Sequence, residues 1–350
     1  MKNSNVIIVL LSVVAVFVLG VMLQELRTVL LPFSVAVLLS FIFRPLVFFL
    51  KARKIPTVFS LLMVLLSLTL VLFLVGLLVY SSAQSFTEAL PRYEARIDGV
   101  IADVGESLEQ LAEPLKIDQE DLDLSNLFQV STITSALSSG VGSFLSFVGN
   151  TFLVILFMLF LLAGTGDLEA KVKRALPSEV AERIATVVNN ASAQVRQYLV
   201  TKTLISAATG LLIALILWIL GVDFPLLWGF LAFLLNYIPN IGSLLSVVFP
   251  FLLSLLQFDT LTRPIIAIIL METVQIVMGN VIEPRMMAFS LNLSPLLVLV
   301  SLIFWGWLWG IIGMILAVPL TATIKIIFEN IEPLRPVAVL MGGELKAKGG

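Results

Sequence analysis

Long apolar runs, separated by shorter polar segments, dominate the chain. A helix needs about 20 apolar residues to cross the hydrocarbon core of a bilayer. The runs that approach or exceed this length are Val6–Leu23, Thr28–Leu50, Val58–Tyr80, Val141–Leu162, Leu204–Leu220 and Pro264–Val281. The pattern predicts an all-α polytopic membrane protein with six full spans.

Two more apolar segments, 224–257 and 293–328, are interrupted. The first contains Asn236-Tyr237-Ile238-Pro239-Asn240-Ile241-Gly242-Ser243, which separates two runs that are each too short to span. In the second, glycines alternate with tryptophans before Pro319. A helix breaks at membrane depth only where protein or water satisfies the freed N–H and C=O groups. We therefore expect two broken re-entrant helical hairpins, which mark the binding site of a secondary transporter.

The two interrupted segments resemble each other. Pro225-Leu226-Leu227 opens one and Pro295-Leu296-Leu297 opens the other, and each then reaches an Ile-Gly pair and a proline. If they enter from opposite faces, they form an inverted repeat. If each segment instead crossed the whole membrane and returned, the rest of the chain would lie on the same sides as with re-entrant hairpins. The sequence does not separate these two alternatives.

The polar segments differ in charge. Acidic residues predominate over 83–140, and basic residues predominate over 165–202. Apolar residues recur every three or four positions within 90–115 and 180–198, which is typical of amphipathic helices. Each apolar stripe either packs within one protomer or contacts another subunit, and the sequence does not separate these alternatives.

The basic clusters predict the orientation, because cytoplasmic loops of membrane proteins carry an excess of Lys and Arg. With the cluster at 51–54 inside, the acidic segment lies outside and both termini are cytoplasmic. The expected regions are three N-terminal spans (1–82), an acidic extracytoplasmic helical insert (83–140), span four with a cytoplasmic amphipathic helix (141–202), a transport core with both hairpins (203–330) and a cytoplasmic tail (331–350).

Composition narrows the function. Of the residues, 59% are hydrophobic and only 13% are charged, and the mean hydropathy is +1.09. The net charge of -2 is not that of a nucleic-acid-binding surface. The chain has no cysteine and no histidine, which excludes Ser-His-Asp triads, HExxH zinc sites and thiolate chemistry. We therefore expect neither an enzyme nor a bound metal or cofactor.

Charged and polar residues of the sixth span are candidates for ion coupling and gating. Glu272 lies near its middle, where an ionised group costs roughly 2.5–3.5 kcal/mol on translocon scales. This carboxylate either couples transport to a proton or cation, or faces the bundle interior neutral or paired. Gln275 and Asn280 lie close enough to that face to line one polar path. Glu283 and Arg285 either form a gate ion pair, or Arg285 simply follows the positive-inside rule while Glu283 offsets its charge.

The helix breaks supply the candidate solute path. Asn236 and Asn240 bracket Pro239, and their amides, with freed carbonyls, either bind a polar or cationic solute or only satisfy the broken backbone. Gly242 follows this turn. In the second segment the glycines either form the matching turn or let helices pack closely. These glycines are Gly306, Gly310 and Gly313.

Together these residues are similar to those of a known family. The first break resembles an Asn-aromatic-Ile-Pro-x-Ile-Gly signature, and Gly279-Asn280-Val281-Ile282-Glu283-Pro284-Arg285 resembles a Gly-Asn-x-x-x-Pro element. The segment from Leu293-Ser294-Pro295 to Ala317-Val318-Pro319-Leu320 resembles a C-terminal signature. The chain thus resembles the autoinducer-2 exporter family, specifically its autoinducer-2 transport protein branch, over nearly its whole length.

The resemblance implies a multi-pass protein of the bacterial inner membrane, in contact with lipid, that assembles as a homo-oligomer, with a pentamer expected. It implies export of the furanone-derived quorum-sensing signal autoinducer-2, a small polar solute. Similar proteins have been assigned sodium(lithium)/proton antiport, so sodium or protons are alternative partners. Glu272 lies outside the family signatures, and its coupling role rests on membrane energetics alone.

The expected mechanism is alternating access, in which two polar hairpin tips meet around Asn236, Asn240 and Gly310 and move against spans one to three. One rival is a cation/proton antiporter that uses Glu272. Another is a membrane scaffold without transport that presents 83–140 to a partner. A channel is a further alternative, since selectivity filters also use broken backbone.

Overall fold

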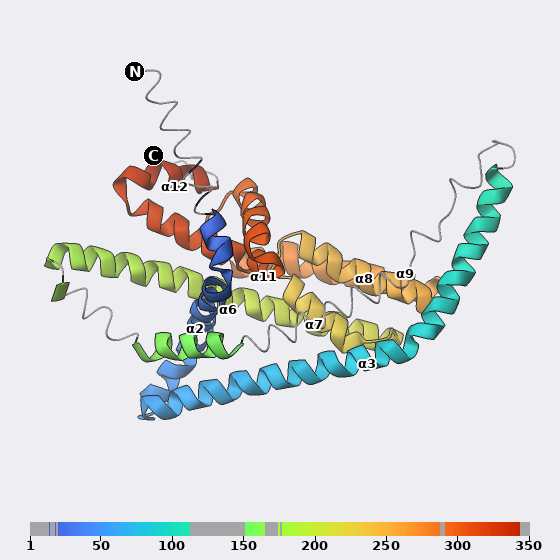
Figure 1. Ribbon diagram of the computed structural model, residues 1–350, viewed down its shortest axis with the longest axis horizontal. Coiled ribbons are helices and arrows are strands. Elements are labelled where there is room, and N and C mark those ends of the chain that lie inside the picture. The colour runs from blue at the N-terminus through green and yellow to red at the C-terminus, as the bar shows by residue number, and fades with distance from the viewer. Residues whose placement is uncertain are drawn as a thin grey trace, which may run out of the picture.

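The computed structural model describes residues 14, 18, 20–112, 151–164, 174–175, 177–287 and 291–343, with 83, 90, 94, 97, 98, 100–112 and 183 described by their backbone alone. These residues are almost entirely helical (Figure 1). The main helices are α2 (Arg27–Ala52), α3 (Thr57–Ala112), a helix at Thr151–Gly164, α6 (Ser178–Leu220), α7 (Pro225–Leu235), α8 (Ile241–Gln257), α9 (Thr262–Ile276), α10 (Glu283–Met286), α11 (Pro295–Glu329) and α12 (Arg335–Met341). A π-helix joins α9 to α10 (Val277–Ile282), and a short 3₁₀ turn precedes α12 (Glu332–Leu334).

Five helices are long and apolar enough to cross a bilayer. They are Arg27–Ala52, Thr57–Ala89, Ser178–Leu220, Thr262–Met286 and Pro295–Glu329. This confirms the helical, polytopic character predicted from the apolar runs. Most of the first predicted span, Val6–Leu23, lies outside the described residues, and the fourth is described only from residue 151. The number of six full spans therefore stays a prediction.

Two helices run through positions where the sequence pattern predicts separate elements. α3 continues from the third predicted span into the acidic segment, past the expected boundary at 82 and 83, and holds Pro91 within it. α6 joins the amphipathic segment at 180–198 to the fifth predicted span. Residues 81–90 contain neither glycine nor proline, and neither do 199–203, so nothing ends the helix there.

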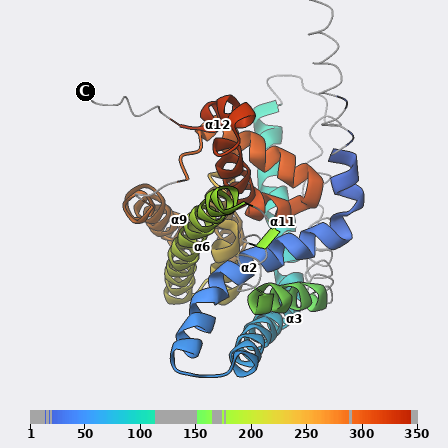
Figure 2. The same ribbon diagram turned by 90° about the vertical axis from the view of Figure 1, so that its left-hand side faces the viewer.

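α6 lies at the centre of the bundle. It contacts α2, α7, α9, α10 and α11, and its contact with α7 is the most extensive. A Cβ added to Gly210 of α6 would lie 2.5 Å from the carbonyl oxygen of Gly229 in α7, and one added to Gly229 would lie 2.6 Å from that of Gly210. Two glycines thus let these helices approach backbone to backbone. Figure 2 views α6 obliquely along its axis, with α2 beside it.

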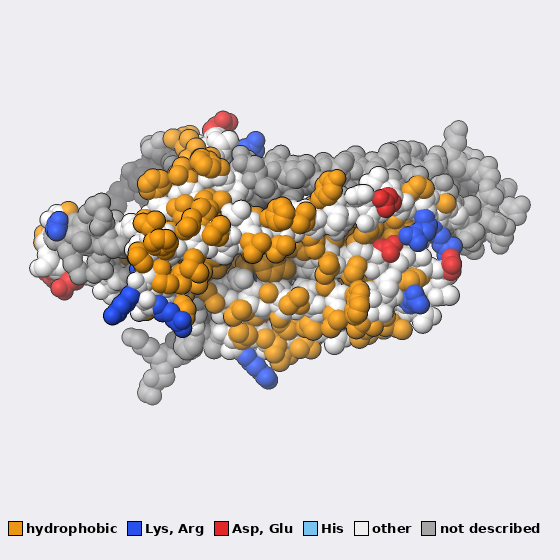
Figure 3. Space-filling model, turned by 90° about the horizontal axis from the view of Figure 1, so that it is seen from below, with side chains coloured by type: hydrophobic (Ala, Val, Ile, Leu, Met, Phe, Trp, Pro, Cys, Tyr) orange, Lys and Arg blue, Asp and Glu red, His pale blue; other side chains and the backbone are white. Residues whose placement is uncertain are grey.

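The surface fits a lipid environment. Large apolar side chains are exposed along α3, among them Phe73 at 61% and Leu70 at 57%. Hydrophobic side chains cover the middle of the face seen in Figure 3, Lys and Arg gather toward its left-hand end, and acidic and basic side chains lie together toward its right-hand end. A broad apolar band between two charged ends is the distribution expected of a protein that crosses a bilayer.

Candidate functional site

The first interrupted segment folds as two short helices joined by a tight turn. α7 begins at Pro225, a favoured residue for the first helical position, and α8 begins after Asn240. Asn240 has a φ of 62° and is exposed, whereas Asn236 is buried. The side-chain amide of Asn236 donates to Ser206 Oγ of α6 at 2.9 Å. Tyr237 Oη and Thr203 Oγ1, 2.6 Å apart, form a second link.

Gly242 holds α7 and α8 close together at this turn. Its N–H donates to the carbonyl of Ile238 at 3.1 Å. A Cβ added here would lie 1.8 Å from the carbonyl oxygen of Leu235, far inside any allowed contact. Glycine is therefore required at this position by close backbone approach.

The second interrupted segment also reverses direction. α11 is not one continuous helix, because Trp309 (φ -130°, ψ 15°) and Gly310 (φ 65°, ψ -146°) have non-helical backbone. Its two halves pack together, since Thr321 Oγ1 donates to Ser301 Oγ at 3.0 Å and accepts the Trp305 indole N–H at 3.1 Å. A Cβ on Gly313 would lie 1.9 Å from the carbonyl oxygen of Trp305. The same backbone approach thus occurs in both segments.

The other residues predicted for the second break lie on either side of this turn in α11. Gly306 packs against the side chain of Met314, and Pro319 is buried in the second half of α11. Ser294 caps the first half by accepting the Leu297 N–H, and Pro295 occupies the first turn. Sequence signals for a helix start and a break therefore coincide with the observed ones.

The two turns approach one buried cluster. Ile238, from the first turn, belongs to the same hydrophobic cluster as Trp305, Leu308 and Trp309 of α11. Val195 and Leu199 of α6 belong to it as well. In Figure 1 the α7–α8 hairpin and α11 extend to opposite sides of this central region. The structure thus brings together two chain breaks that lie far apart in the sequence.

The predicted residues of the sixth span differ in burial and in hydrogen-bond partners. Gln275 is 8% exposed and donates to Ser246 Oγ of α8 at 2.6 Å. Glu272 is half-buried in α9, and no hydrogen bond or ion pair joins its carboxylate to another described residue. Asn280 is exposed within the π-helix, an element that often occurs at functional sites. A common path along these three side chains stays a prediction.

Glu283 pairs with a lysine of α6 rather than with Arg285. Its Oε1 lies 2.6 Å from Lys202 Nζ of α6, and the Lys202 side chain is only 5% exposed. Arg285 is exposed and makes no ion pair with a described residue. Of the two alternatives for Glu283 and Arg285, the described residues show no ion pair between them, and Glu283 pairs with Lys202; a gating role for either residue stays a prediction. In the sequence Lys202 is one of several basic residues of its segment, and its position two residues before the apolar run from Leu204 was the signal that could have marked it.

A cavity of about 180 Å³ adjoins this ion pair. It is lined by Gln197, Tyr198 and Thr201 of α6, by Met286 and Met287 after Glu283, and by the segment that leads into α11. The lining is mainly apolar with a few amide and hydroxyl groups, which is the chemistry of a small-molecule site. Thr201 and Met286, which lie near Lys202 and Glu283 along the chain, border this cavity, whereas neither charged residue lines it.

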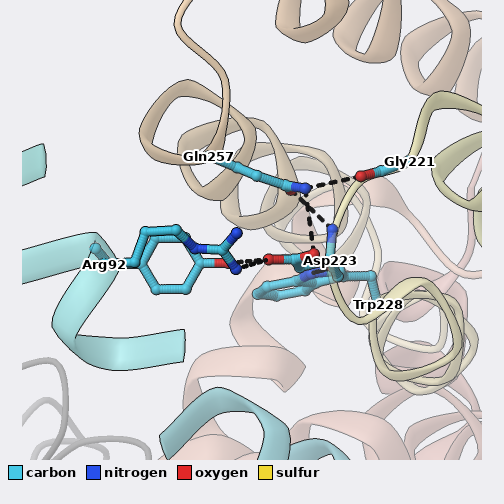
Figure 4. A network of polar contacts seen from close by, with 6 residues as sticks. Arg92, Gly221, Asp223, Trp228 and Gln257 are labelled. Atoms are coloured by element: carbon cyan, nitrogen blue, oxygen red, sulfur yellow. Dashed lines mark hydrogen bonds and ion pairs between the residues drawn. The ribbon is translucent and has the colours of Figure 1, made fainter. Parts of the chain in front are cut away.

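A second polar network lies after the C-terminal end of α6, around Asp223 in the α6–α7 loop (Figure 4). The carboxylate accepts the Tyr93 hydroxyl at 2.5 Å and lies 3.2 Å from an Arg92 guanidinium nitrogen. Gln257 of α8 accepts the Asp223 N–H and donates to Gly221 O, and the Trp228 indole donates to Asp223 O. The extension of α3 is thereby fixed to the first hairpin.

Burial makes Tyr93 the main contact of this network. Its side chain is 2% exposed, and burial, then the hydrogen bond to Asp223, raises the pKa of its hydroxyl. The phenol therefore stays protonated and donates to the carboxylate. Arg92 is 65% exposed, so its ion pair is screened by water and contributes little.

We expect Tyr93→Phe to destabilise the protein by about 1.5–3 kcal/mol, because it removes a buried hydrogen bond to a charged acceptor. Arg92→Gln, the matched control on the same carboxylate, should cost less than about 1 kcal/mol. Thermal unfolding of the purified variants in one detergent measures both. Equal losses in the two variants would contradict this ranking.

Comparison with known proteins agrees with this architecture. The profile of the AI-2E family transporter matches residues 7–332. A putative transport protein of Haemophilus influenzae is 32% identical over 97% of this chain and 98% of its own length. The AI-2 transport protein TqsA of Escherichia coli is 33% identical over 97% of this chain and 96% of its own length. The putative transport protein YhhT of Escherichia coli is 35% identical over 77% of this chain and 75% of its own length.

The match extends from the N-terminal apolar run to the residues that follow α11, so it includes both broken segments and the ion pair. The relatives are named as transport proteins rather than enzymes. The chain belongs to the AI-2E transporter family.

Proposed function

We propose that this protein exports a small polar solute across the bacterial inner membrane by alternating access, and that the solute is autoinducer-2. The observation that carries the proposal is the pair of helix breaks, at 236–240 and 309–310, which approach one buried cluster. Half-helices that end inside a membrane protein direct backbone groups and helix dipoles at a bound solute. The relative named as an AI-2 transport protein supports the choice of solute.

Two polar contacts support the mechanism, one near the middle of α6 and one after its C-terminal end. Lys202–Glu283 adjoins the cavity beside α10, and the Asp223 network holds the α3 extension against α7 and α8. Opening them in turn would expose the hairpin tips to one side at a time. In the proposed orientation, both termini and the Lys202–Glu283 end face the cytoplasm, as the basic loops require. A homo-oligomer, expected to be a pentamer, stays a prediction.

Asn240 tests whether the turn binds solute or only shapes the backbone. Its φ of 62° suits glycine, so Asn240→Gly removes the amide without backbone strain. We expect this variant to lose autoinducer-2 flux at least about tenfold, the effect of one lost hydrogen bond to the solute. The assay measures efflux from loaded proteoliposomes, with protein-free liposomes as background.

Asn240→Ala is the matched control, because it removes the amide and also strains the turn by about 1–2 kcal/mol. Loss of flux in both variants supports solute binding by the amide. Wild-type flux in Asn240→Gly would show that the side chain is dispensable. Absence of flux above background for the wild type, with and without ion gradients, would overturn autoinducer-2 export itself.

Substitution of Glu272 tests whether solute export is coupled to an ion. A half-buried carboxylate in an apolar helix favours such coupling. We expect Glu272→Gln to abolish the flux increase that a proton or sodium gradient produces, because an amide cannot exchange a proton or neutralise a cation. Flux without a gradient should remain. Identical gradient responses in both proteins would remove the coupling role, and cation/proton exchange by the wild type without solute would favour the antiporter.

A further inference from the structure

A cavity of about 270 Å³ lies between α2 and α6. Two arginines line it, Arg44 from α2 and Arg196 from α6, together with Phe41, Phe48 and Ser192. It shares no lining residue with the cavity beside Lys202 and Glu283. It is therefore a separate site, to which the transport mechanism above assigns no role.

The charges of this cavity are unbalanced. No carboxylate is among its described lining residues, and neither arginine makes an ion pair with a described residue. Arg44 Nε is buried and has no hydrogen-bond partner among the described residues. Buried donors without partners are rare in native proteins, because an unsatisfied N–H loses its hydrogen bonds to water and gains none in return. Two guanidinium groups around one cavity thus call for an anion.

The position of the cavity indicates the kind of anion. Arg44 precedes Lys51 by two helical turns, roughly 10 Å along α2, and the exposed basic residues Lys51, Arg53 and Lys54 follow. Phe48 is 52% exposed, and the Arg44 guanidinium lies 5.4 Å from its ring centroid. Arginine beside an exposed aromatic ring, close to a basic loop, is the arrangement expected at the boundary between headgroups and acyl chains.

We propose that this cavity binds the phosphate of an anionic phospholipid headgroup. Arg44 and Arg196 hold the phosphate oxygens, because the planar guanidinium donates two parallel hydrogen bonds to such groups. Ser192 supplies a further hydroxyl donor. The acyl chains lie against Phe41 and Phe48. A free phosphate ion shares the headgroup chemistry but gains nothing from these aromatic side chains.

Native mass spectrometry of the full-length protein tests this proposal. The protein is presented with phosphatidylglycerol or with phosphatidylcholine of the same acyl chains, and retained lipid is counted. We expect the wild type to retain phosphatidylglycerol at least about tenfold better. Arg44→Gln/Arg196→Gln should reduce retention to the phosphatidylcholine level. Lys51→Gln/Arg53→Gln, which removes the same charge from the neighbouring loop, should retain the preference.

Ser192→Phe provides a second variant in case loss of both arginines impairs folding, because it fills the cavity and keeps both charges. It should also lose the preference. Equal losses in the loop variant would show general attraction to the basic surface and overturn the site. Displacement of phosphatidylglycerol by millimolar inorganic phosphate would identify a soluble anion and overturn the lipid. Retention is measured without solute, so failure of autoinducer-2 flux leaves this test unaffected.

Discussion

Replacing Gly242 by alanine should reduce solute flux about 100-fold or more. The new Cβ would lie 1.8 Å from the carbonyl oxygen of Leu235 and 2.6 Å from its carbonyl carbon. Both atoms belong to the backbone, so no side chain can rotate away and the α7–α8 turn must open. Overpacking a core costs about 1–3 kcal/mol of stability when flexible side chains can move aside. Backbone atoms cannot move aside in this way, so the cost of this clash should lie at the upper end of that range. The readout is autoinducer-2 efflux from proteoliposomes.

The second hairpin should respond in the same way. Gly313→Ala places a Cβ 1.9 Å from the Trp305 carbonyl oxygen, and we expect a comparable loss of flux. Gly76→Ala is the matched control, because a Cβ at Gly76 of α3 meets no heavy atom within 4 Å. It should transport like the wild type. Normal flux in Gly242→Ala would show that the tight turn is not needed for transport.

Glu283→Gln should destabilise the protein by about 3 kcal/mol, because it leaves the Lys202 ammonium buried without a charged partner. Lys202 is 5% exposed and Glu283 is 23% exposed, so the two halves of the pair are not equivalent. Lys202→Met should cost less, about 1 kcal/mol, since the carboxylate that remains can still reach water. Apparent melting temperatures of both variants in the same detergent measure this asymmetry.

The double variant Lys202→Met/Glu283→Gln should recover most of the loss, because no unpaired charge then remains inside the protein. Arg285→Gln, on the same segment but exposed, is the control and should melt like the wild type. A double variant that is as unstable as Glu283→Gln alone would indicate that packing around the pair, not its charge, holds α6 to α10.

Local backbone signals were the best predicted part of this molecule. Pro239 lacks the N–H that a helix needs, Asn240 and Gly242 are weak helix formers, and the structure ends α7 and starts α8 around them. Gly310 marked the second break, where a φ of 65° is open to glycine at no steric cost. Such features depend on neighbouring residues alone, so a single sequence contains them.

Long-range pairings were not predictable in this way. Lys202 and Glu283 are separated by 81 positions, and Tyr93 and Asp223 by 130. Nothing in the local pattern of either residue indicates its partner, because the packing of α6 against α10 and of α3 against the α6–α7 loop decides it. The continuity of α6 was missed for a different reason: the hydropathy changes along this helix, although residues 199–203 contain no helix breaker.

The close approach of Gly210 and Gly229 has a consequence for how the protein moves. Helices that touch backbone to backbone have no flexible side chains between them to absorb sliding, so α6 and α7 should travel as one rigid block. One interface where this block can move is that of α6 with α11, across larger side chains such as Leu199, Trp305 and Leu316. The first hairpin should therefore move together with α6, and the two hairpins can shift relative to each other at the contact between α6 and α11.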